Sequence, residues 1–308
     1  EGTYVEGLAD VDRTNELQSF ESVADYQNFV RNYAQVGGNY YGSIGLARAG
    51  GAQEVVMTVE MADTAAAPAG KSAQAVGGSE FSETNNQVAG VDEADIIKTD
   101  GEYIYSLTGK TLHIIEAYPV EDAKVVDTIT FDERPQSLFI NGDTLAVFGD
   151  AYSNDLVERI GFRPSSGMSF FTLYDISDPS GPEVIKEYYF EGYYFNARMI
   201  DDYVYFVTRS TPEMRPVHPL PIIMEDDMVR EMAVSDIQFF PMPYHGAQLV
   251  TTHAINLDDA DEDVSSVATT VDDAQSMYMS EENLFVVSQQ YISEWELEQE
   301  VIRDLLHP

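Results

Sequence analysis

A hairpin pattern that returns four times most constrains the fold of this 308-residue chain. In each copy a polar turn leads into an apolar or aromatic strand. The copies are DGEYIY (100–105), NGDTLA (141–146), DDYVYF (201–206) and EENLFV (281–286). Asp100-Gly101 and Asn141-Gly142 indicate tight turns, because glycine adopts the positive φ that such turns need.

Two further strand-like runs follow each of the first three hairpins. The third strands are TLHIIEAY (111–118), SFFTLYDI (169–176) and QLVTTHAI (248–255); the fourth are KVVDTITF (124–131), PEVIKEYYF (182–190) and SSVATTV (265–271). Four strands per unit, separated by insertions over 149–168, 210–247 and 258–276, are typical of β-propeller blades, which bury their apolar faces only by stacking. The sequence therefore predicts an all-β fold: a β-propeller with at least three four-stranded blades and part of a fourth.

The fourth hairpin leads into a predicted helix instead of a third strand. Ser293 and Glu296 form a capping box, and Leu297, Val301 and Leu305 lie on one face. Three blades and a hairpin fall short of the four to eight blades of a closed ring. We therefore expect a propeller domain over 81–308 that is incomplete at its C-terminus.

Two segments precede the propeller. We expect residues 1–41 to be an N-terminal helical segment, with a helix over 19–38. Ser22 can cap this helix, with the Asp25 side chain reaching back toward the open amides, and Gly37-Gly38 ends it. Residues 42–80 read as an Ala/Gly-rich linker with one strand-like run, EVVMTVEM at 54–61. We expect this run to pair as a β-strand, either with the chain's own propeller or with a neighbouring subunit, which would make the protein self-assembling.

The stretch TNNQVAGVDEADIIKTDG carries a resemblance to a known family. Thr84-Asn85, Gln87, the block at 90–101, and the later NGD and YDISDP strings resemble secreted bacterial and archaeal proteins with a C-terminal β-propeller domain, distantly related to WD40 repeats. The resemblance covers about residues 80–308 and implies a propeller fold and export to the cell exterior or surface. It carries no catalytic residues to this chain, which resembles the first half to two-thirds of a family member.

Charge narrows the possible partners. The chain has 54 acidic and 16 basic residues, a net charge of −38, which suits a surface hydrated in high salt or a soluble extracellular protein. Nucleic acid and anionic membrane surfaces are therefore poor partners, because both bind cationic faces, and we expect no nucleic-acid partner. No apolar run is long enough to span a membrane. The absence of cysteine excludes disulfides and thiolate chemistry.

One acidic stretch is a candidate metal site. Asp259, Asp261 and Asp263 have the alternating spacing of a calcium loop, but Val264 stands where that loop has glycine, so a solvated loop is the simpler interpretation. No other cofactor is predicted. The five histidines have no metal-ligand spacing; His113, for example, lies inside a strand.

Catalytic motifs are missing from the sequence. It has no GxSxG, P-loop or GxGxxG motif and no sialidase-type SxDxGxTW box. Because it has a single tryptophan, the repeated Trp motifs of quinoprotein propellers are also absent. The aromatic clusters YYFEGYYF (188–195) and QFFPMPY (238–244) could bind sugars where exposed, although alternating aromatics in strands usually form core.

Two functions from different classes follow. The favoured one is a non-catalytic extracellular or cell-surface propeller that binds protein or surface glycan, or assembles with such components. The alternative is a secreted hydrolase acting on polysaccharide or peptide, which would need two carboxylates about 5–10 Å apart in a pocket, with raised pKa.

Overall fold

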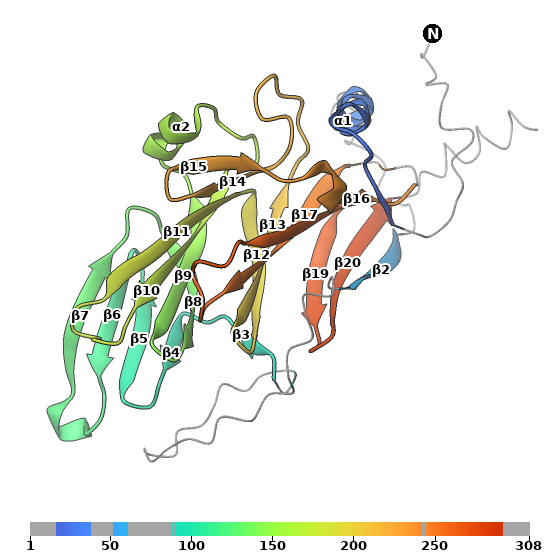
Figure 1. The fold of residues 1–308 in the computed structure, drawn as a ribbon. Coiled ribbons are helices and arrows are strands. Elements are labelled where there is room, and N and C mark those ends of the chain that lie inside the picture. Colours follow the sequence, from blue (N-terminus) through green and yellow to red (C-terminus); the bar gives the residue numbers. More distant parts are fainter. Residues whose placement is uncertain are drawn as a thin grey trace, which may run out of the picture.

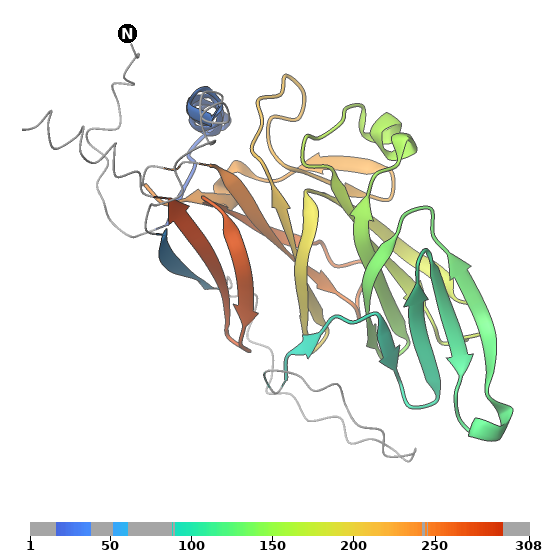
Figure 2. The ribbon, with the colours of Figure 1, turned by 180° about the vertical axis from the view of Figure 1, so that it is seen from behind.

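The computed structural model describes residues 17–37, 52–60, 88, 90–241, 244 and 246–291, as four β-sheets and two α-helices (Figure 1). The expected all-β class is confirmed. Figures 1 and 2 show the sheets side by side in chain order. The predicted helix after residue 292, and residues 1–16, 38–51 and 61–87 of the N-terminal segments, lie outside the described residues.

The first sheet follows the repeat closely. Its antiparallel strands, in spatial order, are β4 (Ile97–Thr99), β5 (Tyr103–Thr108), β6 (Thr111–Glu116) and β7 (Lys124–Thr130), with the 3-10 turn η1 (Val120–Asp122) between the last two. The Asp100 carboxylate accepts the N–H groups of Glu102 (2.9 Å) and Tyr103 (2.7 Å), and Gly101 has φ 98°. The Asp-Gly dipeptide thus makes the expected tight turn.

The second sheet has the same four-strand core with an added hairpin. The core is β8 (Pro135–Asn141), β9 (Thr144–Ala151), β10 (Met168–Asp175) and β11 (Glu183–Glu191), and β14 (Ile222–Glu225) and β15 (Met228–Glu231) extend it beyond β11. Helix α2 (Asn154–Ile160) lies between β9 and β10, inside the insertion expected over 149–168.

The third sheet contains β12 (Tyr193–Ile200), β13 (Tyr203–Ser210), β17 (Gln248–Asn256) and β18 (Ser265–Val271). Three short strands extend it: β3 (Asp92–Glu93) beside β12, β16 (Ile237–Phe239) beside β18, and β1 (Gln18–Ser19) beside β16; the 3-10 turn η2 (Val234–Asp236) precedes β16. The insertion expected over 258–276 is shorter than predicted, because β18 begins at Ser265 and β19 at Ala274.

The fourth sheet contains the strand predicted in the linker. Strands β19 (Ala274–Met279) and β20 (Asn283–Tyr291) form a hairpin, and β2 (Ala52–Glu60) adds to it as a third strand. β2 pairs antiparallel with β20, from Ala52 opposite Tyr291 to Glu60 opposite Asn283. The run predicted at 54–61 therefore pairs with the chain's own fourth hairpin, in the position that a third strand holds elsewhere. The number of blades in the whole propeller stays a prediction.

Stacked sheet faces form the core. Leu112 and Ile114 of the first sheet pack with Leu138 and Val147 of the second. Alternation along each strand directs one set of apolar residues into this interface. Between the second and third sheets, aromatic rings dominate: the ring centroid of Phe206 on β13 lies 5.4 Å from that of Phe148 and 5.3 Å from that of Phe171. Figure 1 shows α1, α2, β14 and β15 at one end of the sheets, which we call the insertion end.

Helix α1 (Val23–Gly37) begins four residues later than predicted. The Ser22 hydroxyl accepts the N–H of Asp25 (3.2 Å) and donates to the Asp25 carboxylate, so the carboxylate meets the cap hydroxyl and not the open amides. Phe20 stacks on Phe239 with 4.5 Å between centroids, which holds this segment on the third sheet. Among the described residues no helix is long and apolar enough to span a membrane.

Candidate functional site: a groove at the insertion end of the second sheet

Helix α2 forms one wall of the candidate site. Ser153 caps it, with its Oγ accepting the N–H groups of Asp155 (3.0 Å) and Leu156 (3.4 Å). Gly161, in the left-handed conformation at φ 81°, ends it, since glycine takes this conformation without a steric penalty. Leu156 and Ile160 are buried in a cluster with residues of β10 and β14. These contacts fix the helix against the sheet.

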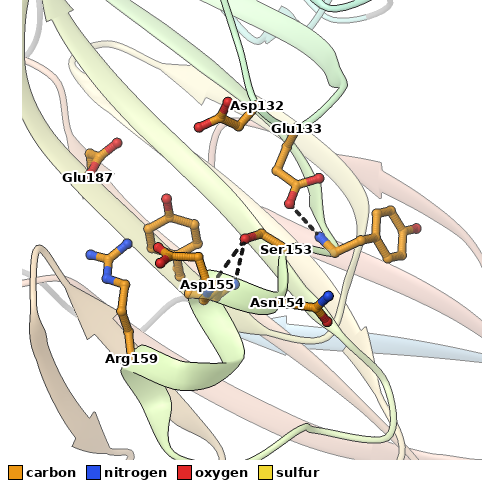
Figure 3. Close-up of a pocket in the computed structure, with 10 residues that line it drawn as sticks. Asp132, Glu133, Ser153, Asn154, Asp155, Arg159 and Glu187 are labelled. Atoms are coloured by element: carbon orange, nitrogen blue, oxygen red, sulfur yellow. Dashed lines mark hydrogen bonds between the residues drawn. The ribbon is translucent and has the colours of Figure 1, made fainter.

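An open groove of about 690 Å³ lies between α2, β11 and the β7–β8 turn. Its lining residues are Asp132, Glu133, Tyr152, Ser153, Asn154, Asp155, Leu156, Arg159, Glu187 and Tyr189. Figure 3 shows the labelled side chains reaching this space from the three segments. We call it the blade 2 groove.

Acidic groups dominate the groove, which has four carboxylates and one guanidinium. Arg159 donates from Nε (3.1 Å) and Nη2 (2.9 Å) to Asp227 Oδ1, and from Nη2 to the Asp226 carbonyl oxygen (2.7 Å). Its guanidinium also lies 5.4 Å from the ring centroid of Tyr189. The arginine is therefore held by the β14–β15 turn, and the carboxylates on the other walls give the groove a negative charge.

A smaller hollow of about 130 Å³ adjoins the groove and shares Tyr152, Ser153 and Leu156 with it. Tyr152 and Tyr193 line this hollow with exposed fractions of 62% and 40%, and their ring centroids lie 6.2 Å apart at 37° between planes. Gly167 has φ 68°, and a Cβ there would come within 3.0 Å of Tyr193 Cε1. Glycine thus lets the Tyr193 ring lie against the backbone.

Hydrogen bonds fix the position of this tyrosine pair. The Tyr152 N–H donates to Glu133 Oε1 (2.9 Å) and its hydroxyl to Asp150 Oδ2 (3.3 Å). The other oxygen of Asp150 accepts the N–H of Tyr194 (2.7 Å), next to Tyr193. Partial burial, and then the Asp150 charge, raise the pKa of the Tyr152 phenol, so this hydroxyl stays protonated and can donate.

A buried carboxyl lies outside the groove. Burial raises the pKa of Glu191, although Arg215 opposes the shift. The Glu191 side chain is 5% exposed, and its Oε2 accepts from Arg215 Nη2 (3.0 Å) and the Ile222 N–H (3.1 Å). Its partners are thus an arginine and a backbone N–H, and it does not line the groove.

The structure does not bring the predicted calcium residues together. The Asp259 carboxylate accepts the N–H of Asp261 (3.0 Å), a local turn contact. Within the described ranges no group of three or more His, Asp or Glu side chains is placed to hold a metal ion. Calcium binding by Asp259, Asp261 and Asp263 stays a prediction without a side-chain cluster to support it.

The two aromatic clusters divide between core and surface. Tyr188 and Phe190 of β11 are buried, whereas Tyr189 lines the groove and Tyr193 is exposed. In the second cluster Phe239 packs on Phe20. His253 is buried too, which lowers its pKa to about 3 and keeps it neutral.

Sequence reasoning missed most groove residues. Asp132, Glu133 and Glu187 lie in or next to ordinary strands, and Tyr152 precedes a helix that was not predicted. The signal available was SNDLVERIGF at 153–162, where Ser153 is a helix N-cap residue and Gly161 a C-terminal one.

Comparisons with known proteins agree with this architecture. Residues 81–303 match the sequence profile of the β-propeller domain family. An uncharacterized protein of Methanocaldococcus jannaschii is 29% identical over 130 residues, 42% of this chain and 17% of the relative. An uncharacterized protein of Archaeoglobus fulgidus is 32% identical over 148 residues, 46% of this chain and 22% of the relative. The aligned segments thus span about a fifth of these relatives' length. No solved structure matches the chain.

Proposed function

Because the chain belongs to the β-propeller domain family, we propose that it is a non-catalytic binding module, acting outside the cell or on its surface, that takes its ligand in the blade 2 groove. In this proposal the four sheets are successive blades of one propeller. The observation that carries it is the groove itself, which α2 and the β7–β8 turn build on the sheet. Connecting segments held by a rigid frame are where propellers and other scaffolds place binding residues.

The shape of the groove supports binding over catalysis. It is an open groove, and the buried carboxyl with a raised pKa, Glu191, lies elsewhere in an ion pair. A glycosidase needs an acid kept protonated next to a second carboxylate.

The hydrolase remains the second candidate, because four carboxylates line one concave space. Incubation of the protein with neutral polysaccharides and with unfolded protein, followed by measurement of new reducing ends or amines, tests it. Turnover that Glu187→Gln abolishes would replace the binding proposal.

The binding proposal is tested by filling the groove. Glu187→Trp adds a large ring on β11 inside the groove, and Glu183→Trp makes the same change outside it, on the same strand. We expect binding to panels of immobilised oligosaccharides and peptides to be lost in the Glu187 variant and kept in the Glu183 variant. Equal binding by both variants would rule out this groove. Fractionation of cells producing the full-length protein tests the extracellular location.

A further inference from the structure

We propose that the ligand of the blade 2 groove is a neutral glycan, with one sugar ring on the Tyr152–Tyr193 pair and its hydroxyl groups bound by the groove carboxylates. This inference rests on the proposed binding function and names its ligand class.

The tyrosine pair is the first support. Tyr152 and Tyr193 are 62% and 40% exposed, although large aromatic rings contribute most when buried. Their backbone contacts to Glu133 and, through Tyr194, to Asp150 hold them in place before any ligand arrives. A fixed, exposed ring pair binds at a low entropic cost. A sugar ring has an apolar C–H face that matches such a surface.

The carboxylates beside the pair are the second support. Asp132, Glu133, Asp155 and Glu187 are acceptors once ionised, and the hydroxyl groups of a sugar are donors. Hydrogen bonds to an ionised acceptor are about twice as strong as neutral ones. The groove, at about 690 Å³ next to the hollow of about 130 Å³, has enough volume for more than one sugar unit.

Charge decides between classes of ligand. An anionic glycan would meet four carboxylates on a chain of net charge −38, and the like charges would repel it. A cationic peptide would be attracted by the carboxylates, but the Arg159 guanidinium, 5.4 Å from the ring centroid of Tyr189, already occupies the position where a cation would contact this ring. A neutral, hydroxyl-rich ligand meets neither obstacle.

The test uses the intact chain and defined probes. The neutral probes are hexasaccharides of β-1,4-glucose, α-1,4-glucose, α-1,6-mannose and β-1,4-N-acetylglucosamine; hexalysine and a sulfated hexasaccharide are the charged ones. Calorimetric titration should show that at least one neutral probe binds, with a Kd that changes less than about 3-fold between 0.05 and 1 M NaCl, because screening acts on charge pairs.

Matched variants locate the binding. Tyr152→Ala and Tyr193→Ala should each weaken binding by about 10-fold or more, as expected for central aromatic contacts, whereas the Phe variants should keep it within about 3-fold. Tyr278→Ala removes a 46% exposed tyrosine on the fourth sheet and should have no effect. Circular dichroism and unfolding temperatures confirm that the variants fold.

Each contrary outcome has its own meaning. If hexalysine binds and Glu187→Trp abolishes that binding, the glycan inference is wrong and the binding function stands. The same holds for the sulfated probe, or for a neutral probe that ignores both tyrosine changes while remaining sensitive to Glu187→Trp. If no probe, and nothing on the larger panels, responds to Glu187→Trp, both proposals fail.

Discussion

Arg215→Met is the most revealing single change outside the groove, because Arg215 belongs to a buried ion pair. Its side chain is 9% exposed and that of Glu191 is 5% exposed, with 3.0 Å between Nη2 and Oε2. Nη2 also donates to the Leu220 carbonyl oxygen (2.9 Å), and the guanidinium lies 4.7 Å from the ring centroid of Phe162. The pair thus joins the insertion after β13 to the end of β11.

The expected loss of unfolding free energy is large. Removing one partner of a buried pair leaves an uncompensated charge and costs about 3–5 kcal/mol. Arg215 Nε and Nη1 have no hydrogen-bond partner among the described residues, although Nη1 lies 3.4 Å from Oε1 of the partly exposed Glu213, so the pair is not fully satisfied. The double change Glu191→Gln with Arg215→Met removes both charges and keeps an acceptor for the Ile222 N–H. We expect it to be within about 1–2 kcal/mol of the wild type, since replacing both members of such a pair is often neutral.

The pH dependence has a definite sign. Burial raises the pKa of Glu191 above its ordinary value of 4.5, and Arg215 opposes this shift, so its loss raises the pKa further. Above pH 4.5 the folded variant then holds a proton that the unfolded chain has released. Stability relative to the wild type must therefore fall as pH rises through the folded pKa. The deficit should be smallest near pH 4.5 and largest at neutral pH.

Urea unfolding in 0.5 M NaCl at pH 5 and pH 8 measures both effects. Arg163→Met is the matched control: this exposed arginine donates to Asn154 Oδ1 (2.6 Å), and its removal should cost less than about 1 kcal/mol. A deficit for Arg215→Met that is equal at the two pH values, or a double variant no more stable than the single one, would refute this account of the pair.

Three further predictions concern salt, the linker strand and calcium. The thermal unfolding midpoint should rise from 0.01 to 1 M NaCl, because the Debye length falls from about 30 Å to 3 Å and screens the charge of −38; a flat or falling midpoint contradicts the high-salt interpretation. Deleting 44–78 removes β2 and should lower the unfolding midpoint without changing the number of subunits found by light scattering, since β2 pairs within its own chain; a smaller number of subunits would indicate exchange of β2 between chains. Addition of 1 mM CaCl₂ should leave the midpoint unchanged, given the absence of a side-chain cluster among the described residues, and a rise that Asp259→Asn removes would establish the calcium loop.

Local signals were enough to predict the repeated strands. Asp100-Gly101 forms its turn through hydrogen bonds within five residues, and apolar runs between turn residues mark the core strands. The extension strands have no such signal. β16 has three residues and β3 two, and each exists because a longer strand offers it an unpaired edge. Their formation depends on neighbours that are distant in the sequence.

The groove shows why a binding site on a repeat protein is harder to predict than the frame. In YYFEGYYF the alternation along β11 buries Tyr188 and Phe190 and turns Tyr189 to the groove, but the pattern alone does not say which face the neighbouring sheet covers. The position of the first sheet determines which face of β11 stays open to the groove. The β7–β8 turn, which leaves the first sheet, supplies Asp132 and Glu133 to the same groove. The tyrosine pair likewise comes from the ends of two different sheets, joined by one carboxylate, Asp150. The contact between Asp150 and Tyr194 crosses from one repeat to the next, so it follows from the stacking of the sheets and not from any single repeat. Residues that depart from the repeat and meet at such a junction are therefore the first places to look for a ligand.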